Sequence, residues 1–175
     1  MTMLTRNRRI GLAVALTGFV ADQALKLLVT GPLGLVKDND QIVLTSFFNL
    51  TRTSNYGVSL GLLTADSDLM RWLLVALTGG IAVMVGAWLL REKKFADILP
   101  LAMILGGALG NIVDRVRFGH VVDFADLHFG AWRPFLVFNL ADALISLGVV
   151  IILARSLLIR EKPIQDKAGM PATEI

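Results

Sequence analysis

The sequence contains no cysteine in its 175 residues. This absence excludes disulfide bonds, thiol nucleophiles and thiolate metal sites, and it leaves the redox compartment undetermined. Charged side chains are also scarce, at 18% of the chain against about a quarter in average soluble domains. Internal repeats and low-complexity tracts are lacking as well. The interpretation therefore depends on the apolar segments and on the few polar residues inside them.

Apolar residues are what the sequence has in excess. They make up 55% of the chain, and the mean hydropathy is +0.67. A soluble core of this size could not bury that much apolar surface, so most of it must face lipid. We therefore predict a single integral membrane domain over residues 1–175.

Four apolar segments are long enough to cross a bilayer. They cover about residues 10–29, 69–90, 95–113 and 135–158. The first follows a basic stretch, as the apolar core of a signal peptide does, but its helical pattern continues through Asp22 and Lys26. A retained first helix is therefore the favoured interpretation. The predicted fold class is an all-α membrane protein, a four-transmembrane-helix bundle.

Two long loops, residues 31–68 and 115–134, connect the predicted spans. In the first loop, Gln41–Leu50 and Leu60–Leu63 have apolar residues that alternate or cluster at lengths typical of strands. The residues between them include the turn formers Asn and Gly. These patterns predict a small extracytoplasmic β-sheet on the outer surface of the membrane.

The basic residues predict the orientation of the bundle. Ten lysines and arginines lie near the termini and in the short turn at 91–94, against six in the longer loops. The positive-inside rule then places both termini in the cytoplasm, including a polar, disordered tail at 159–175. The formal charge of +3 does not indicate nucleic acid as a partner, because the basic residues lie at span ends instead of forming a stripe.

Polar residues inside the predicted spans lie at one depth. Asp22 and Asp142 are each seven residues from the predicted outer end of a span, which is about 10 Å at a rise of ~1.5 Å per residue. The other polar residues near this level are Asn111, Asp114, Arg115 and Asn139. Ionisable groups are costly there and by default indicate a functional site. We therefore predict one site in the outer half of the membrane.

Two of these carboxylates have a base close by in the sequence. Asp22 and Lys26 share a helix face at i,i+4, and Asp114 precedes Arg115 directly. Pairing is the least costly way to hold a charge in a low dielectric, so both pairs are interpreted as a network that supports the fold.

Asp123 and Asp142 have no cation nearby in the sequence. Two such carboxylates in a half-buried cleft would have their pKa values pushed apart, so that together they could activate a water and protonate a leaving group. The sequence does not assign the proton to either residue, and unrelated polar residues remain the alternative. Asp126 is expected to be a solvated loop residue.

Other catalytic sets are less consistent with the sequence. His120 and His128 are spaced H-x₇-H, which fits no common zinc pattern, so no metal is expected. A serine–lysine dyad would need Ser54 or Ser59 beside Lys26, a lysine that the i,i+4 spacing already assigns to an aspartate.

Five sequence blocks resemble the lipoprotein signal peptidases (signal peptidase II), the bacterial membrane aspartyl peptidases. They are D-Q-x-x-K at Asp22, Gln23 and Lys26; N-x-G at Asn55 and Gly57; G-G-A-L-G-N-x-x-D-R from Gly106 to Arg115; G-H-V-V-D-F from Gly119 to Phe124; and F-N-x-A-D from Phe138 to Asp142. The blocks extend from the first apolar segment to the fourth, in the order of the family, and are specific in combination. The chain departs from the family at Ala143, where a serine is frequent, and at 58–60, where small residues and an aromatic are usual.

The resemblance implies cleavage of a prolipoprotein signal peptide just before its diacylglyceryl-modified cysteine, with Asp123 and Asp142 as the catalytic pair. It implies supporting positions around the pair for Asp22, Lys26, Asn55, Gly57, Asn111, Asp114, Arg115 and Asn139. It further implies a place in the bacterial inner membrane, with the prolipoprotein and membrane lipids as partners. We expect a monomer without a cofactor, and we hypothesise that the surface sheet covers or clamps the substrate. A proton-coupled transporter and a non-catalytic scaffold remain the rival interpretations.

Overall fold

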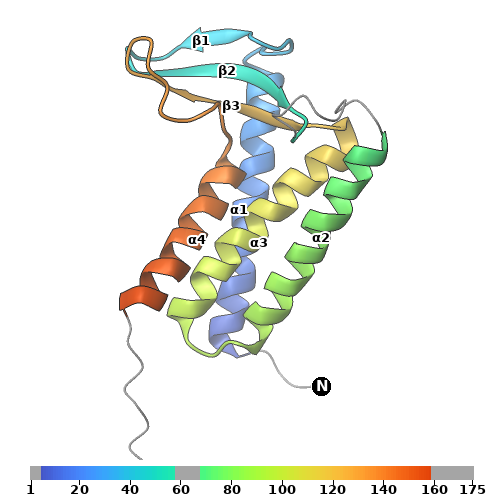
Figure 1. The fold of residues 1–175 in the computed structure, drawn as a ribbon, viewed down its shortest axis with the longest axis vertical. Helices are drawn as coiled ribbons and strands as arrows, with labels where there is room; N and C mark the ends of the chain where they lie inside the picture. The colour runs from blue at the N-terminus through green and yellow to red at the C-terminus, as the bar shows by residue number, and fades with distance from the viewer. Residues whose placement is uncertain (1–4, 58–67, 159–175) are drawn as a thin grey trace, which may run out of the picture.

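The computed structural model of the protein describes residues 5–57 and 68–158. Its elements are α1 (Arg6–Thr30), β1 (Gln41–Val43), β2 (Phe48–Asn55), α2 (Asp68–Arg91), α3 (Phe95–Phe118), β3 (Val121–Leu127) and α4 (Leu140–Leu158). The four helices form a bundle, and the three strands form a sheet across one end of it, which we call the sheet end (Figure 1). All four helices are long and apolar enough to cross a membrane, which confirms the predicted fold class.

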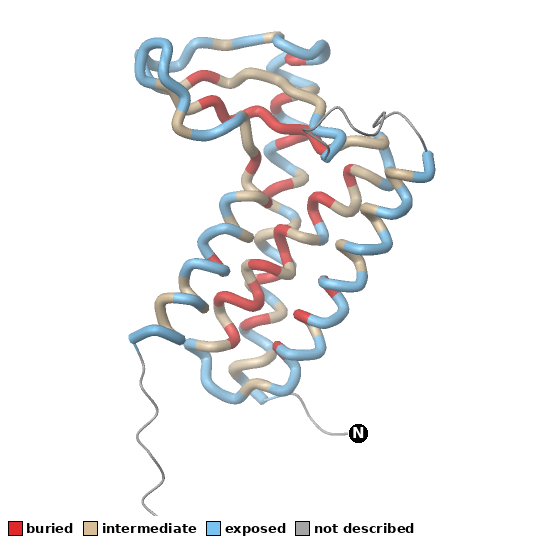
Figure 2. The backbone as a smooth tube through the Cα atoms, in the orientation of Figure 1, coloured by how far each residue is buried: buried red, intermediate tan, exposed pale blue. Residues whose placement is uncertain are grey.

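Helix α3 is the centre of the bundle. Half of the residues in its most apolar stretch are buried, against 22% for α1, 17% for α2 and 11% for α4. Figure 2 shows the same contrast, with buried backbone concentrated along α3 and β3 and exposed backbone along the outer helices. Ile98, Leu101 and Ile104 of α3 form the core with Ala15 of α1 and Val85 of α2. The outer helices therefore present most of their apolar side chains to lipid.

Glycines allow α3 to approach its neighbours closely. A β-carbon at Gly106 would collide with the backbone of α1 at Ala15, and one at Gly107 would collide with the backbone of α4 at Ala141. Small residues at such crossings are typical of membrane helices, because packing and not the hydrophobic effect holds the helices together.

Gly107→Ala is expected to destabilise the bundle by about 1–3 kcal/mol, because the added methyl group must push α4 away from α3. Gly79→Ala in α2 is the matched control, since a β-carbon there has no atom within 4 Å and alanine favours a helix. Unfolding of both variants in detergent would measure the difference. Equal stability of the two variants would contradict the close packing of α3 on α4.

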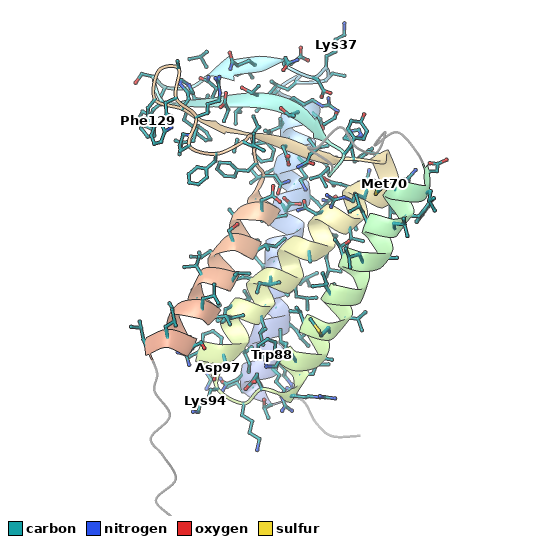
Figure 3. All side chains as sticks on the ribbon, viewed as in Figure 1. Lys37, Met70, Trp88, Lys94, Asp97 and Phe129 are labelled. Atoms are coloured by element: carbon teal, nitrogen blue, oxygen red, sulfur yellow. The ribbon has the colours of Figure 1, made fainter. Side chains whose placement is uncertain are left out.

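The far end of the bundle contains the short turn between α2 and α3, as predicted. Arg8 Nε of α1 donates a hydrogen bond of 2.9 Å to the backbone oxygen of Glu92 in this turn. Arg155 of α4 forms an ion pair of 2.7 Å with Asp97 of α3. Figure 3 shows Lys94 and Asp97 at this end, away from the sheet. The start of α1 and the end of α4 therefore lie at the same end of the bundle.

The sheet is antiparallel with the order β1-β2-β3, and its composition differs from the prediction. The segment Gln41–Leu50 is not one strand but a hairpin, and residues 51–55, predicted as a turn, continue β2. The third strand comes from the second loop, and the predicted strand Leu60–Leu63 lies outside the described residues. Pairing with β3 overrides the turn tendency of the last residues of β2, a tertiary effect that local sequence does not contain.

Two helix boundaries differ from the predicted spans. Helix α3 continues to Phe118 and ends at Gly119, whose φ of 83° turns the chain into β3. Helix α4 begins only at Leu140, because the residues before it pair with β3 through Phe138 and Ala125. Asp142 therefore lies in the first turn of α4 and not two turns inside a span. The predicted tail at 159–175 lies outside the described residues.

Candidate active site

Asp123 of β3 and Asp142 of α4 meet at one residue, Asn139. The side-chain nitrogen of Asn139 donates to Asp123 Oδ1 at 2.6 Å. The side-chain oxygen of Asn139 accepts a hydrogen bond of 2.9 Å from the backbone nitrogen of Asp142. Because one amide contacts both residues, the position of each aspartate depends on the other. The structure thus brings together Asp123 and Asp142, which the sequence separates by 19 positions. We call these two residues the acid pair.

Asn139 and Asp142 form a reciprocal cap at the start of α4. While Asn139 accepts from the backbone of Asp142, its own backbone nitrogen donates to Asp142 Oδ2 at 3.3 Å. This is the geometry of a capping box, with the acid at the third helical position. The positive end of the helix dipole also favours the carboxylate there. The N-x-x-D spacing is the sequence signal that predicts such a cap.

Asp123 is buried, with 1% of its surface exposed, on the strand next to β2. Asn55 of β2 donates to its Oδ2 at 2.9 Å. Burial raises the pKa of Asp123 to about 7, and the nearby charge of Asp142 adds to this, while the hydrogen bonds from Asn55 and Asn139 oppose it. The group can therefore both hold and release a proton near neutral pH.

Gly57 positions Asn55 through the backbone. Its nitrogen donates to Asn55 Oδ1 at 2.8 Å, which leaves the amide nitrogen of Asn55 directed at Asp123. The φ of Gly57 is 84°, a conformation that residues with a β-carbon rarely adopt. Both residues of the N-x-G block thus act together on the buried aspartate.

Asn111 of α3 connects Asp142 to the interior of the bundle. Its side-chain nitrogen donates to Asp142 Oδ1 at 2.8 Å, and its oxygen accepts from Asn139 and from Lys26 at 3.3 Å each. The amide is oriented by these three contacts. It holds the carboxylate of Asp142 against the central helix.

Below the acid pair, Lys26 of α1 bridges two buried carboxylates. Its ammonium group lies 2.8 Å from both Asp22 Oδ2 and Asp114 Oδ2. The other oxygen of Asp22 accepts from the backbone of Ala141 in α4 at 3.0 Å, and Asp114 Oδ1 accepts from Gln23 at 2.9 Å. The predicted pair of Asp22 and Lys26 is confirmed. The network joins α1, α3 and α4 beneath the site.

The predicted pairing of Asp114 with Arg115 is wrong. Consecutive residues of a helix point about 100° apart, and Asp114 turns inward to Lys26. Arg115 instead donates a long bond of 3.5 Å to the backbone oxygen of Asn111. Its guanidinium lies near enough to Asp142 and Asp123 to interact with both charges. Arg115 is therefore a cation beside the acid pair.

Asp126 is not a solvated loop residue, contrary to the prediction. It lies in β3 with 1% of its surface exposed, and it accepts hydrogen bonds from Arg133 at 3.1 Å and Thr51 at 3.1 Å. Burial alone would raise the pKa of Asp126, but the bonds from Arg133 and Thr51 outweigh it and hold the pKa below its usual range. Its distance of three positions from Asp123 in a strand directs it to the other face of the sheet.

A cleft of about 230 Å³ reaches the acid pair from the side of α4. Its walls are mostly apolar, and its lining residues are Phe135, Phe138, Asp142, Ala143 and Ser146. Ala143, the position where the sequence departs from the resemblance, is thus part of this wall. An apolar substrate segment in the membrane could reach Asp142 through the cleft without crossing the sheet.

The rival catalytic sets do not form among the described residues. Ser54 donates to Asp38 at 2.8 Å, and Lys26 is saturated by carboxylates, so these two residues make no dyad. Ser59 lies outside the described residues.

A proton relay would need ionisable groups through the bilayer, and the sequence of the helices lacks them. No Asp, Glu, Lys, Arg or His occurs in the middle stretches 10–21, 72–90, 98–113 and 143–154. The ion pair of Asp97 and Arg155 is therefore separated from the acid pair by apolar helix. This arrangement disfavours a transporter.

These features define a class of protein: a multi-pass membrane protein with a polar, enzyme-like site that holds two carboxylates at one end of its bundle. Comparison with known proteins narrows the class. A family model described as signal peptidase (SPase) II matches residues 14–158. Relatives named lipoprotein signal peptidase, from Sphingopyxis alaskensis and Rhizorhabdus wittichii, are 54% and 50% identical over 91% and 89% of this chain and 92% and 90% of their own.

The fold agrees with these sequence comparisons. A solved structure described as a bacterial membrane enzyme has 27% sequence identity and a TM-score of 0.72, over 85% of this chain and 92% of its own. The chain belongs to the signal peptidase II family and is therefore a membrane peptidase, a hydrolase.

Proposed function

We propose that this protein is an aspartyl endopeptidase that removes signal peptides from diacylglyceryl-modified prolipoproteins, cleaving just before the lipidated cysteine. The observation that carries the mechanism is the contact of Asn139 with both Asp123 and Asp142. An acid with a pKa near 7 beside a second carboxylate suits general acid–base catalysis at neutral pH.

In this mechanism the pair shares one proton. The ionised carboxylate takes a proton from a water, whose oxygen attacks the carbonyl carbon of the scissile peptide. The protonated carboxyl donates its proton to the amide nitrogen, the C–N bond breaks, and the new amine leaves. The pair titrates together, so neither role is assigned to one residue. Arg115 supplies positive charge next to the pair, and Asn55, Asn111 and Asn139 hold the two carboxylates in place.

The position of the site suits a substrate anchored by lipid. Asp142 lies in the first turn of α4, at the sheet end, and its cleft opens toward the lipid-facing side of that helix. A diacylglyceryl group can stay in the leaflet while the neighbouring peptide reaches the pair. With the termini in the cytoplasm, as the basic residues predict, this leaflet is the outer one. The sheet would then cover the bound peptide from outside. In this proposal the protein acts as a monomer and without a cofactor.

Cleavage of a purified prolipoprotein by the purified protein would test this proposal. The diacylglyceryl-modified substrate should be cut, with product masses placing the cut before the modified cysteine, while the unmodified precursor should remain intact. Activity should persist in EDTA. Equal cleavage of both precursors would overturn the substrate assignment, and loss of activity in EDTA that zinc restores would overturn the two-carboxylate mechanism.

Asn55→Ala is expected to shift the pH profile of cleavage upward. The bond from Asn55 stabilises the ionised form of Asp123 and so lowers its pKa, and removing it should raise that pKa further above 7. The alkaline limb of kcat/KM, where the pair loses its last proton, should therefore move to higher pH. Asn7→Ala at the far end is the matched control and should leave the limb in place. A downward shift for Asn55→Ala would contradict the assignment.

A further inference from the structure

A second hollow lies between the sheet ends of α1 and α3, beneath the sheet. Its volume is about 180 Å³. Leu27 of α1 and Phe118 of α3 form part of its walls, and Arg52 of β2, Arg117 of α3 and His120 lie along its lining. We call this hollow the α1–α3 groove.

The α1–α3 groove is distinct from the acid pair. Val122 of β3 lines the groove, and successive side chains of a strand point to opposite faces, so Asp123 is directed away from it. Lys26 and Asp114 also line the groove, but their charges are already used: Asp114 accepts from Gln23, Lys26 and the backbone of Val122. The charged groups of Lys26 and Asp114 therefore have partners within the protein, and any ligand must be recognised by the other residues of the groove.

Two arginines of the groove have unused donor capacity. Among the described residues Arg117 has no carboxylate partner, and its guanidinium lies over the ring of Phe118 at 4.8 Å. Arg52 binds Asp38 through Nη1 at 2.5 Å, but its Nε is buried without a partner in the described parts of the chain. The same holds for His120 Nε2. Buried donors without acceptors are costly, which indicates that a ligand or water supplies the acceptors.

The walls beside these donors are apolar and exposed. Leu27 is 57% exposed and Phe118 is 48% exposed, both near the ends of helices that are long and apolar enough to cross a membrane. The groove thus combines nitrogen donors with exposed apolar surface at the sheet end of the bundle. This is the arrangement of polar and apolar parts in a phospholipid, whereas a free anion would have no use for the apolar walls.

We propose that the α1–α3 groove binds a phospholipid of the leaflet at the sheet end, through its phosphodiester headgroup. The phosphate oxygens accept from Arg52 and Arg117, and the acyl chains lie over Leu27 and Phe118. Arginine suits this role because its planar fork of donors matches phosphate. Burial and the nearby Arg52 charge lower the pKa of His120, so its neutral ring lines the groove without adding a charge. The lipid would clamp β2 onto the ends of α1 and α3.

Lipid binding measured by native mass spectrometry of the detergent-solubilised full chain would test the proposal. Dioleoylphosphatidylglycerol should bind, and Arg117→Gln should weaken its apparent Kd about tenfold or more, with Arg52→Gln/Arg117→Gln weaker still. Arg9→Gln, an exposed arginine at the far end, is the matched control for the loss of charge. Because Arg117 is exposed and makes no ion pair among the described residues, its variant should fold, which thermal unfolding would verify.

Three outcomes would overturn the lipid site. The first is equal binding of phosphatidylglycerol by the wild type and the double variant. The second is equal binding of dioleoylglycerol, which has the same chains but no phosphate and would show that the headgroup is not recognised. The third is complete displacement of the lipid by millimolar inorganic phosphate, which would show a site for free anions. None of these results depends on peptide cleavage, so the test is independent of the proposed activity.

Discussion

Asparagine in place of Asp123 or Asp142 is expected to lower kcat for prolipoprotein cleavage by about 10³-fold, within the range typical of a lost general acid or base. Each substitution keeps the shape of the side chain but removes its capacity to hold or release a proton. Loss of one member disables the pair, so the double variant should be about as inactive as either single variant. Single-turnover cleavage of the diacylglyceryl-modified substrate would measure the effect.

Asp126→Asn is the matched control for this prediction. Asp126 is as buried as Asp123 and lies in the same strand, but it contacts Arg133 and Thr51. Its substitution should therefore affect stability more than kcat, with a change of less than about tenfold in the chemical step. A loss of activity for Asp126→Asn as large as that for Asp123→Asn would mean that the assay reports folding and not chemistry.

The spans and the clustering of the buried charges could be predicted from the sequence because both follow from the membrane itself. Lipid tolerates only long apolar helices, so the four helices are visible as apolar runs. Charges inside such runs are so costly that Asp22, Lys26 and Asp114 had to lie together, wherever each occurs in the chain. The prediction was right about the cluster and wrong about one pairing, because Lys26 can reach two carboxylates while sequence neighbours such as Arg115 point elsewhere.

The third strand of the sheet could not be predicted from local sequence, because β2 and β3 pair across about 70 residues of the chain. Thr53 of β2 lies opposite Asp123 of β3, and nothing in either segment specifies the other. The same pairing determines two further features. It buries Asp126, and it places Asn55 where it can bind Asp123. Site details that depend on strand register thus require the tertiary structure, whereas those that depend on helix periodicity do not.

The start of α4 shows how a local signal can have a catalytic consequence. Asn139 caps the helix, and capping fixes both its own amide and the carboxylate of Asp142. The same amide reaches Asp123 in β3. A motif that normally only caps the start of a helix therefore also links the two acids. The start of α4 at Leu140 is therefore needed for the site, because a helix that began earlier would remove Asn139 from the cap.

Lys26→Met is expected to destabilise the protein by about 3–5 kcal/mol, the cost typical of breaking a buried ion pair from one side. Methionine fills a similar volume, but it leaves Asp22 and Asp114 buried at 0% and 1% exposure without their cation. The acid pair should also lose support, because Lys26 donates a hydrogen bond to Asn111, which binds Asp142. Unfolding in detergent at neutral pH would measure the loss, with Lys37→Met as the control at an exposed position of the sheet end (Figure 3).

A second set of variants separates lost charge from lost packing. If uncompensated charge is the cause, adding Asp22→Asn and Asp114→Asn to Lys26→Met should recover much of the stability, because no buried charge then remains in the network. If the methionine simply packs badly, the triple variant should be no more stable than Lys26→Met alone. Recovery of stability without recovery of cleavage would show that the cation also orients Asn111 at the acid pair. A Lys26→Met protein within 1 kcal/mol of the wild type would contradict the network as the support of the site.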